Sequence, residues 1–92
     1  MKKEIFFDGN IINSKDEFHL EFAKTLSFPS YYSHNLDDLW TSLTSYIDPN
    51  IRLMIRGLDH LSLIFGAESQ GLLDVFEKLP EACPELELII QP

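Results

Sequence analysis

The sequence contains a single cysteine, Cys83, among its 92 residues. One cysteine can form no intrachain disulfide and no thiolate metal cage, which suits a reducing compartment. No apolar run approaches the roughly 20 residues that span a bilayer. Glu4 and Asp8 interrupt the region where a signal peptide would carry its apolar core. We therefore expect a cytoplasmic protein without a membrane span.

Basic residues are also scarce, with seven Lys and Arg against 15 Asp and Glu and a formal net charge of −8. Such a charge repels phosphate backbones and anionic membranes, so direct binding of nucleic acid or membrane is not expected. It would attract a basic protein if the carboxylates converge on one face. Simple solubility is the alternative explanation, so the location of the charges must decide.

The length fits one domain, predicted over residues 1–92. Short apolar segments bounded by turn residues predict three strands, at 3–8, 51–56 and 86–90. Helical patterns separate them. Strands that alternate with helices favour a small parallel sheet with crossover helices, so the predicted fold class is α/β.

The first helix is predicted from Ser14, a residue type that caps helices, with Glu17 placed to complete a capping box. An apolar residue recurs every fourth position along one face, and Pro29 cannot continue the helix. The helix should end near Leu26. The apolar face, predicted as core, consists of Phe18, Phe22 and Leu26.

Further helices are predicted later in the chain. Asn35 can cap a helix over residues 36–47, which the turn residues at 48–50 end. Residues 58–65 form either a short helix or a turn. A last helix, entered at 66–69, is expected to stop at Pro80, with residues 80–84 as a turn.

The segment 29–46 is the most informative part of the chain. On a helix of 3.6 residues per turn, one face forms a buried apolar stripe. The opposite arc carries small polar side chains and no lysine or arginine. The stripe consists of Leu36, Leu39, Leu43 and Ile47, and the arc of Asp37, Asp38, Thr41, Thr44 and Ser45. Exposed Tyr31, Tyr32 and Trp40 would add contact area. This pattern predicts a binding surface for a basic partner, with an ordinary solvated helix face as the alternative.

Catalysis lacks a candidate constellation. His34, Asp37 and Asp38 are close enough in sequence to suggest a metal site, but no second histidine or cysteine joins them. His19 and His60 are isolated, which is typical of surface or hydrogen-bonded structural histidines. The four glycines are scattered singly, so no phosphate-binding loop is present. We predict that the protein is not an enzyme and uses no cofactor or metal.

The residues of this segment resemble the signature of the barstar family of intracellular ribonuclease inhibitors. The matching motifs are Pro29, Tyr31-Tyr32, Asn35-Leu36-Asp37, Leu39-Trp40 and Leu43-Thr44. The resemblance implies an α/β fold with a three-stranded parallel sheet packed by about four helices. It also implies a stoichiometric, 1:1 inhibitor that blocks the active site of a basic, secreted barnase-like ribonuclease with an acidic helix and its preceding loop.

The resemblance further implies which residues contact the partner. Tyr31 should pack on the enzyme, Asp37 should pair with its active-site cations, and Asn35 should orient the helix. The full implied contact set is Tyr31, Asn35, Asp37, Asp38, Trp40, Thr41 and Tyr46.

Three positions depart from the type member of the family. Thr41 stands where the type member has an aspartate, Lys78 replaces a glutamate, and Tyr46 stands for a tryptophan. These departures keep open a second hypothesis, in which a barstar-fold interaction or immunity module binds a different basic protein.

Overall fold

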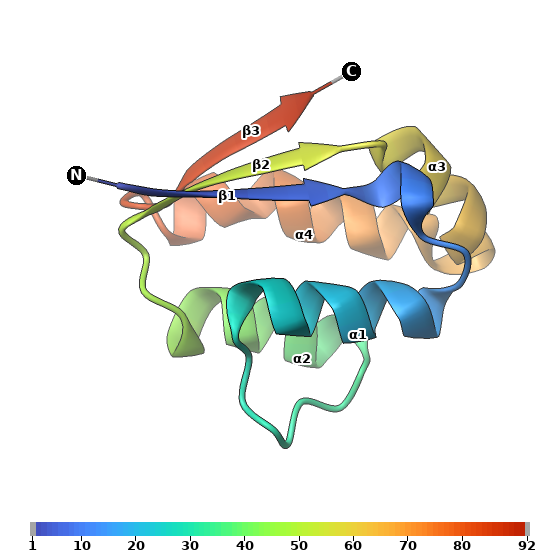
Figure 1. Cartoon of the computed structure of the whole chain (residues 1–92), viewed down its shortest axis with the longest axis horizontal. Coiled ribbons are helices and arrows are strands. Elements are labelled where there is room, and N and C mark those ends of the chain that lie inside the picture. Colours follow the sequence, from blue (N-terminus) through green and yellow to red (C-terminus); the bar gives the residue numbers. More distant parts are fainter. Residues whose placement is uncertain (1, 92) are drawn as a thin grey trace.

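Three strands lie side by side in one sheet in the computed structural model, which describes residues 2–91 (Figure 1). They are β1 (Lys3–Asp8), β2 (Ile51–Arg56) and β3 (Glu87–Gln91). Both pairings are parallel and the order is β1-β2-β3, with Ile5 opposite Leu53 and Leu53 opposite Leu88. The predicted three-stranded parallel sheet is confirmed, and its last strand begins one residue later than expected.

Helices connect the strands. They are α1 (Lys15–Leu26), α2 (Leu36–Thr41), α3 (Leu58–Phe65) and α4 (Ser69–Ala82), with 3₁₀ turns η1 (Gly9–Ile11) and η3 (Gly66–Glu68) and a π-helical turn η2 (Ser42–Tyr46). In Figure 1, α1, α2 and α4 all lie on one side of the sheet, and α3 lies at the carboxyl ends of the strands. Among residues 2–91, no helix is both long and apolar enough to cross a membrane.

The core lies between the sheet and these helices. Alternate residues of β2 are fully or almost fully buried, namely Ile51, Leu53 and Ile55. The apolar face predicted for α1 is confirmed as core, and Phe22 packs edge-to-face on Phe7 with ring centroids 5.0 Å apart. Burial of such side chains drives folding, because each removes a large apolar surface from water.

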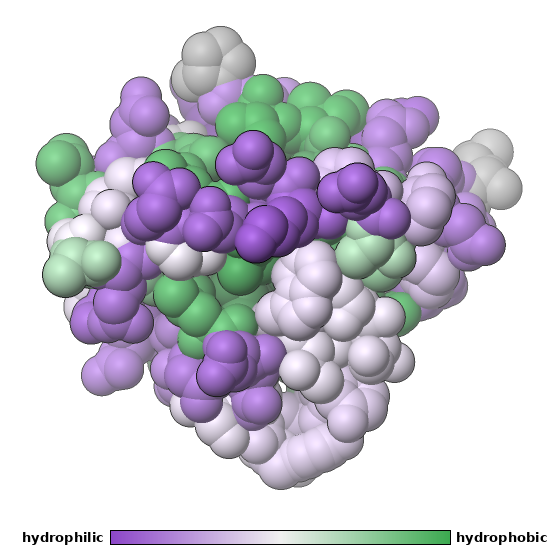
Figure 2. Space-filling model, turned by 180° about the vertical axis from the view of Figure 1, so that it is seen from behind, coloured by the Kyte–Doolittle hydropathy of each residue, from purple (hydrophilic) through white to green (hydrophobic). Residues whose placement is uncertain are grey.

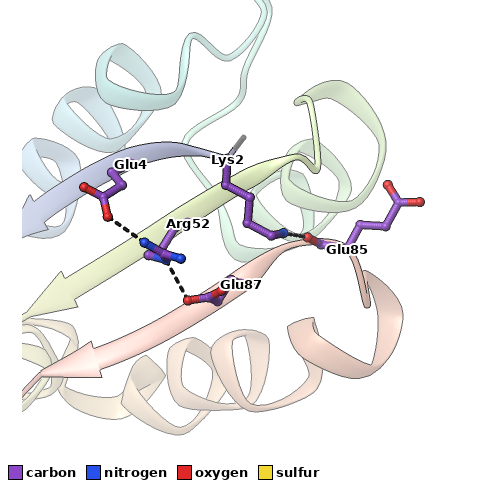
Figure 3. Close-up of polar contacts among 5 residues, drawn as sticks. All are labelled: Lys2, Glu4, Arg52, Glu85 and Glu87. Atoms are coloured by element: carbon purple, nitrogen blue, oxygen red, sulfur yellow. Dashed lines mark hydrogen bonds and ion pairs between the residues drawn. The ribbon is translucent and has the colours of Figure 1, made fainter.

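The other face of the sheet carries a row of charges across the three strands (Figure 3). Arg52 Nε donates to Glu87 Oε2 and Arg52 Nη1 donates to Glu4 Oε2, each at 2.7 Å. The hydrogen bond to Glu87 and, to a smaller extent, the one to Glu4 raise the pKa of Arg52. Figure 3 also shows Lys2 reaching the backbone carbonyl of Glu85.

The predicted stop of the last helix at Pro80 is wrong, because α4 continues to Ala82. Proline removes one backbone donor and crowds the preceding turn, which normally ends a helix. Here Pro80 lies in the last turn of α4, which forms despite the loss of one backbone donor. Leu79 is fully buried and its carbonyl accepts from the Cys83 amide at 2.8 Å, so tertiary packing keeps the chain helical.

Candidate functional site

The start of α2 is fixed by its capping residue. Asn35 has extended backbone angles and its side-chain Oδ1 accepts a hydrogen bond from the Asp38 amide at 2.7 Å, as predicted. Asp37 and Asp38 occupy the first turn, where the positive end of the helix dipole favours carboxylates. Asp37 is exposed, so its carboxylate is available to a partner.

Asp38 has a different environment from Asp37. It is half-buried, and its Oδ2 accepts a hydrogen bond from the Ser33 amide at 2.8 Å. Helical periodicity predicted that both carboxylates lie on the polar arc opposite the buried stripe. The structure instead uses Asp38 to tie the preceding loop to α2, which orients the carboxylate in advance of any contact.

Tyr32 was expected to be exposed, and this expectation is wrong. Its ring is half-buried against the core, 5.0 Å from the ring of Phe28, and its hydroxyl lies 2.6 Å from His19 Nδ1. Burial, with a smaller contribution from the charge of Asp38, raises the pKa of Tyr32. Trp40 is also half-buried rather than fully exposed. Tyr32 is therefore an anchor of the loop and Tyr31 is its exposed neighbour.

After Thr41 the chain widens into the π-helical turn η2, so the predicted continuous α-helix over 36–47 is wrong in its second half. In an α-helix the Thr44 amide would bond the carbonyl of Trp40. Here the Thr44 hydroxyl donates to that carbonyl at 2.8 Å. The wider turn buries Ser42 together with Leu43, although only Leu43 was predicted as core.

Tyr31 and Tyr46 meet across the surface beside this turn. Their ring centroids are 6.0 Å apart at 69°, and the residues are 62% and 54% exposed. Hydrogen bonding with Tyr46 raises the pKa of Tyr31. The two rings border a hollow of about 250 Å³. It is lined by Pro29, Tyr31, Tyr32, Asp38, Thr41, Ser42 and Tyr46.

A second depression, of about 540 Å³, lies between α2 and α4. Gly71 permits this approach, because a Cβ there would lie only 2.8 Å from Leu36 Cδ1. The exposed cation Lys78 lines this groove together with two carboxylates, Asp37 of α2 and Asp74 of α4. It is lined by Leu36, Asp37, Trp40, Gly71, Asp74, Val75 and Lys78.

We call residues 29–46, comprising the loop, α2 and η2, the contact surface. The structure divides its predicted residues between the two depressions: Tyr31, Asp38, Thr41 and Tyr46 line the first, and Asp37 and Trp40 the second. Seen from behind (Figure 2), the lower part of the molecule around this segment is largely pale, as expected for its serine, threonine and tyrosine side chains. A hydrophilic band crosses the molecule above it.

Among residues 2–91, no three or more His, Cys, Asp or Glu side chains are grouped so that they could hold a metal ion. His34 is the histidine considered for a metal site, and the other two histidines have structural partners. His19 contacts Tyr32, and His60 Nε2 lies 2.8 Å from the carbonyl oxygen of Ile12.

The fold is that of a small α/β domain with a parallel three-stranded sheet and helices on one side. Residues 3–89 match the model of the family described as barstar (barnase inhibitor), and the chain belongs to this family. The family consists of inhibitors rather than enzymes. The chain is also 28% identical over 90 residues to the Bacillus subtilis (strain 168) protein named "Putative ribonuclease inhibitor YrdF", with 97% of this chain and 99% of the relative covered.

Proposed function

We propose that this protein is a stoichiometric inhibitor that binds a basic, barnase-like ribonuclease in a 1:1 complex and blocks its active site with the contact surface. Membership of the barstar family supports a ribonuclease as the partner. The observation that carries the proposal is the contact surface itself: residues 29–46 present carboxylates and tyrosines and contain no lysine or arginine.

Asp37 is the proposed centre of the electrostatic contact. A catalytic site that binds RNA phosphate must hold cationic side chains, and the same cations can pair with a carboxylate presented in a dry, complementary setting. Asp37 is exposed on the first turn of α2, whose orientation the Asn35 cap fixes. Tyr31 and Tyr46 add large exposed rings that cost little conformational entropy to order.

Asp38 is proposed to compensate for the missing charge at position 41. Thr41 is uncharged, but it lines the same hollow as Asp38, Tyr31 and Tyr46. A cationic side chain that enters this hollow would meet the Asp38 carboxylate and aromatic rings together. The compensation therefore depends on the shape of the hollow and not on helix position alone.

Lys78 favours a second candidate function. It lies in the groove with Asp37 and Asp74, and it brings a positive charge to the edge of an otherwise acidic surface. A like charge facing a basic enzyme would weaken the complex. This observation supports the alternative in which the same surface binds a different basic protein, one that places no cation against this groove, as an interaction or immunity module.

Titration into a barnase-like ribonuclease, followed by RNA cleavage, tests the proposal. We expect cleavage to cease at an equimolar ratio. Asp37→Ala should weaken binding by roughly 2–5 kcal/mol, because the enzyme cation loses its partner. Asp59→Ala is the matched control: Asp59 is also exposed and is also the second residue of its helix, but it lies on α3 and outside the contact surface.

Two results would contradict the proposal. Absence of inhibition by the wild-type protein at equimolar concentration would favour the interaction module. Equal effects of Asp37→Ala and Asp59→Ala would show that only overall charge matters and that Asp37 makes no direct contact.

A further inference from the structure

His19 lies on α1, outside the contact surface, and is almost completely buried, with 3% of its surface exposed. On its inner side are the core rings of Phe18 and Phe65, with centroids 5.3 and 6.0 Å away. On its outer side the Tyr32 hydroxyl lies 2.6 Å from Nδ1. An unprotonated Nδ1 accepts a hydrogen bond from this hydroxyl, so both of these atoms have a partner.

The same loop supplies a second ring over His19. The imidazole of His34 stacks on that of His19 with ring centroids 5.9 Å apart at 17°, and it lies 5.4 Å from the ring of Tyr32. His34 has a φ of 51°, a left-handed conformation that costs a residue other than glycine about 1 kcal/mol. The loop accepts this conformation and closes over His19 with two aromatic side chains.

Building on the function proposed above, we propose that His19 is a positioning residue of the contact surface: its neutral imidazole holds Tyr32 and the loop 29–35 in place, and its protonation releases this loop. Tyr31 is the most exposed tyrosine of the contact surface. Its position depends on that of Tyr32, because the two residues are adjacent in the chain. Its contact with Tyr46 depends on where Tyr32 is anchored.

Protonation does not by itself remove the contact with Tyr32, since a protonated Nδ1 could donate to the tyrosine oxygen. The difficulty is the burial of a cation. Phe18 and Phe65 belong to the core, whereas Tyr32 and His34 belong to the loop. Water therefore reaches the charged imidazole most readily if the loop moves away.

The charged groups around His19 act in both directions. Burial is the main cause that lowers the pKa of His19 from 6.5 to about 4, and His34 and Lys15 lower it further. Asp16 and Glu68 attract the protonated form and partly oppose this shift. Burial keeps Tyr32 in its neutral, donating form, because it raises the pKa of that hydroxyl.

These values give the direction and size of the effect. With the loop open, His19 would titrate near 6.5, and with the loop closed near 4. The open form therefore binds more protons between these values and gains population as the pH falls. At pH 5 the ratio of open to closed loop should be about 20-fold higher than at pH 7.

Hydrogen exchange of the loop amides measures this ratio without any partner. The amide of Tyr32 donates to Pro29 and that of Ser33 to Asp38, so both are protected when the loop is closed. We expect their protection factors in the wild-type chain to fall about 20-fold between pH 7 and pH 5. In His19→Gln, whose side chain can still bond Tyr32 but cannot titrate, they should not change with pH.

Two controls separate loop release from general effects. His60→Gln, which removes the half-buried histidine of α3, should leave the pH response as in the wild type. The Leu53 amide in β2 reports global unfolding, whose free energy also falls between pH 7 and pH 5 because His19 regains its ordinary pKa in the unfolded chain. Leu53 should nevertheless stay far more protected than the loop amides at both pH values, because loop opening requires less free energy than global unfolding. An unchanged pH response in His19→Gln, or loop amides that are as strongly protected as Leu53 at pH 5, would overturn the proposal.

Tyr32→Phe then links the loop to binding, because it removes only the hydroxyl. We expect lower loop protection at pH 7 and weaker inhibition of the ribonuclease, while Leu53 remains far more protected than the loop. If the wild-type chain inhibits no ribonuclease, the proposed function fails while the exchange results still test the role of His19. If Tyr32→Phe loosens the loop yet inhibits as well as the wild type, the link between His19 and the contact surface is wrong.

Discussion

The molecule has two regions that are built in different ways. The framework, consisting of β1, β2, β3, α1 and α4, is held by the burial of apolar side chains such as Phe22 and Leu53. The contact surface is held mainly by directed hydrogen bonds, in which Asn35 caps α2 and Asp38 ties down the loop. Substitutions in the framework should therefore change stability, and substitutions on the contact surface should change affinity.

The largest expected effect is that of Phe22→Ala in the framework. Phe22 is fully buried, and its ring lies 5.0 Å from those of Phe7 and Phe18. Loss of this ring should lower the free energy of unfolding by about 3–5 kcal/mol, through lost burial and the cavity left behind. Urea unfolding measures the change. Affinity per folded molecule should be unchanged, and a loss of affinity beyond the unfolded fraction would contradict the separation.

The framework was largely predictable because its signals are local. Apolar residues alternate in 51–56, which predicts one buried face of a strand. Apolar residues at every fourth position from Phe18 to Leu26 likewise predict one buried face of a helix. The caps at Ser14 and Asn35 need only their own side chain and a nearby amide, so both were predicted and both are present. The continuation of α4 past Pro80 depends instead on the burial of Leu79. The local rule that proline ends a helix does not take such burial into account.

The contact surface was predicted in composition but only partly in geometry. The tyrosines, carboxylates and Asn35 are visible in the sequence, whereas the anchoring of Tyr32 by His19 joins residues 13 positions apart. The π-helical turn was likewise not predicted, because the apolar residues of 36–47 recur with the period of a continuous α-helix. Which tyrosine is exposed and which is buried therefore follows from tertiary packing.

Two helix caps provide an intermediate and closely matched comparison. Ser14 Oγ accepts from the Glu17 amide at 3.1 Å in the framework, and Asn35 Oδ1 accepts from the Asp38 amide at 2.7 Å in the contact surface. Ser14→Ala and Asn35→Ala should each lower the free energy of unfolding by about 1 kcal/mol. Only Asn35→Ala should also weaken ribonuclease inhibition, because it disturbs the orientation of Asp37. Equal affinities of the two variants would argue against that positioning role.

The smallest expected effect concerns the charged row on the outer face of the sheet (Figure 3). Glu87→Gln removes one of the two carboxylates that accept from Arg52, while Glu4 remains in place. Exposed ion pairs contribute little, so Tm should fall by no more than a few degrees, and by less at high salt. Inhibition should be unaffected, because this face is opposite the side of the sheet that carries α2. A measurable loss of affinity in Glu87→Gln would show that the two regions are coupled through the sheet, and that framework and contact surface cannot be treated as separate.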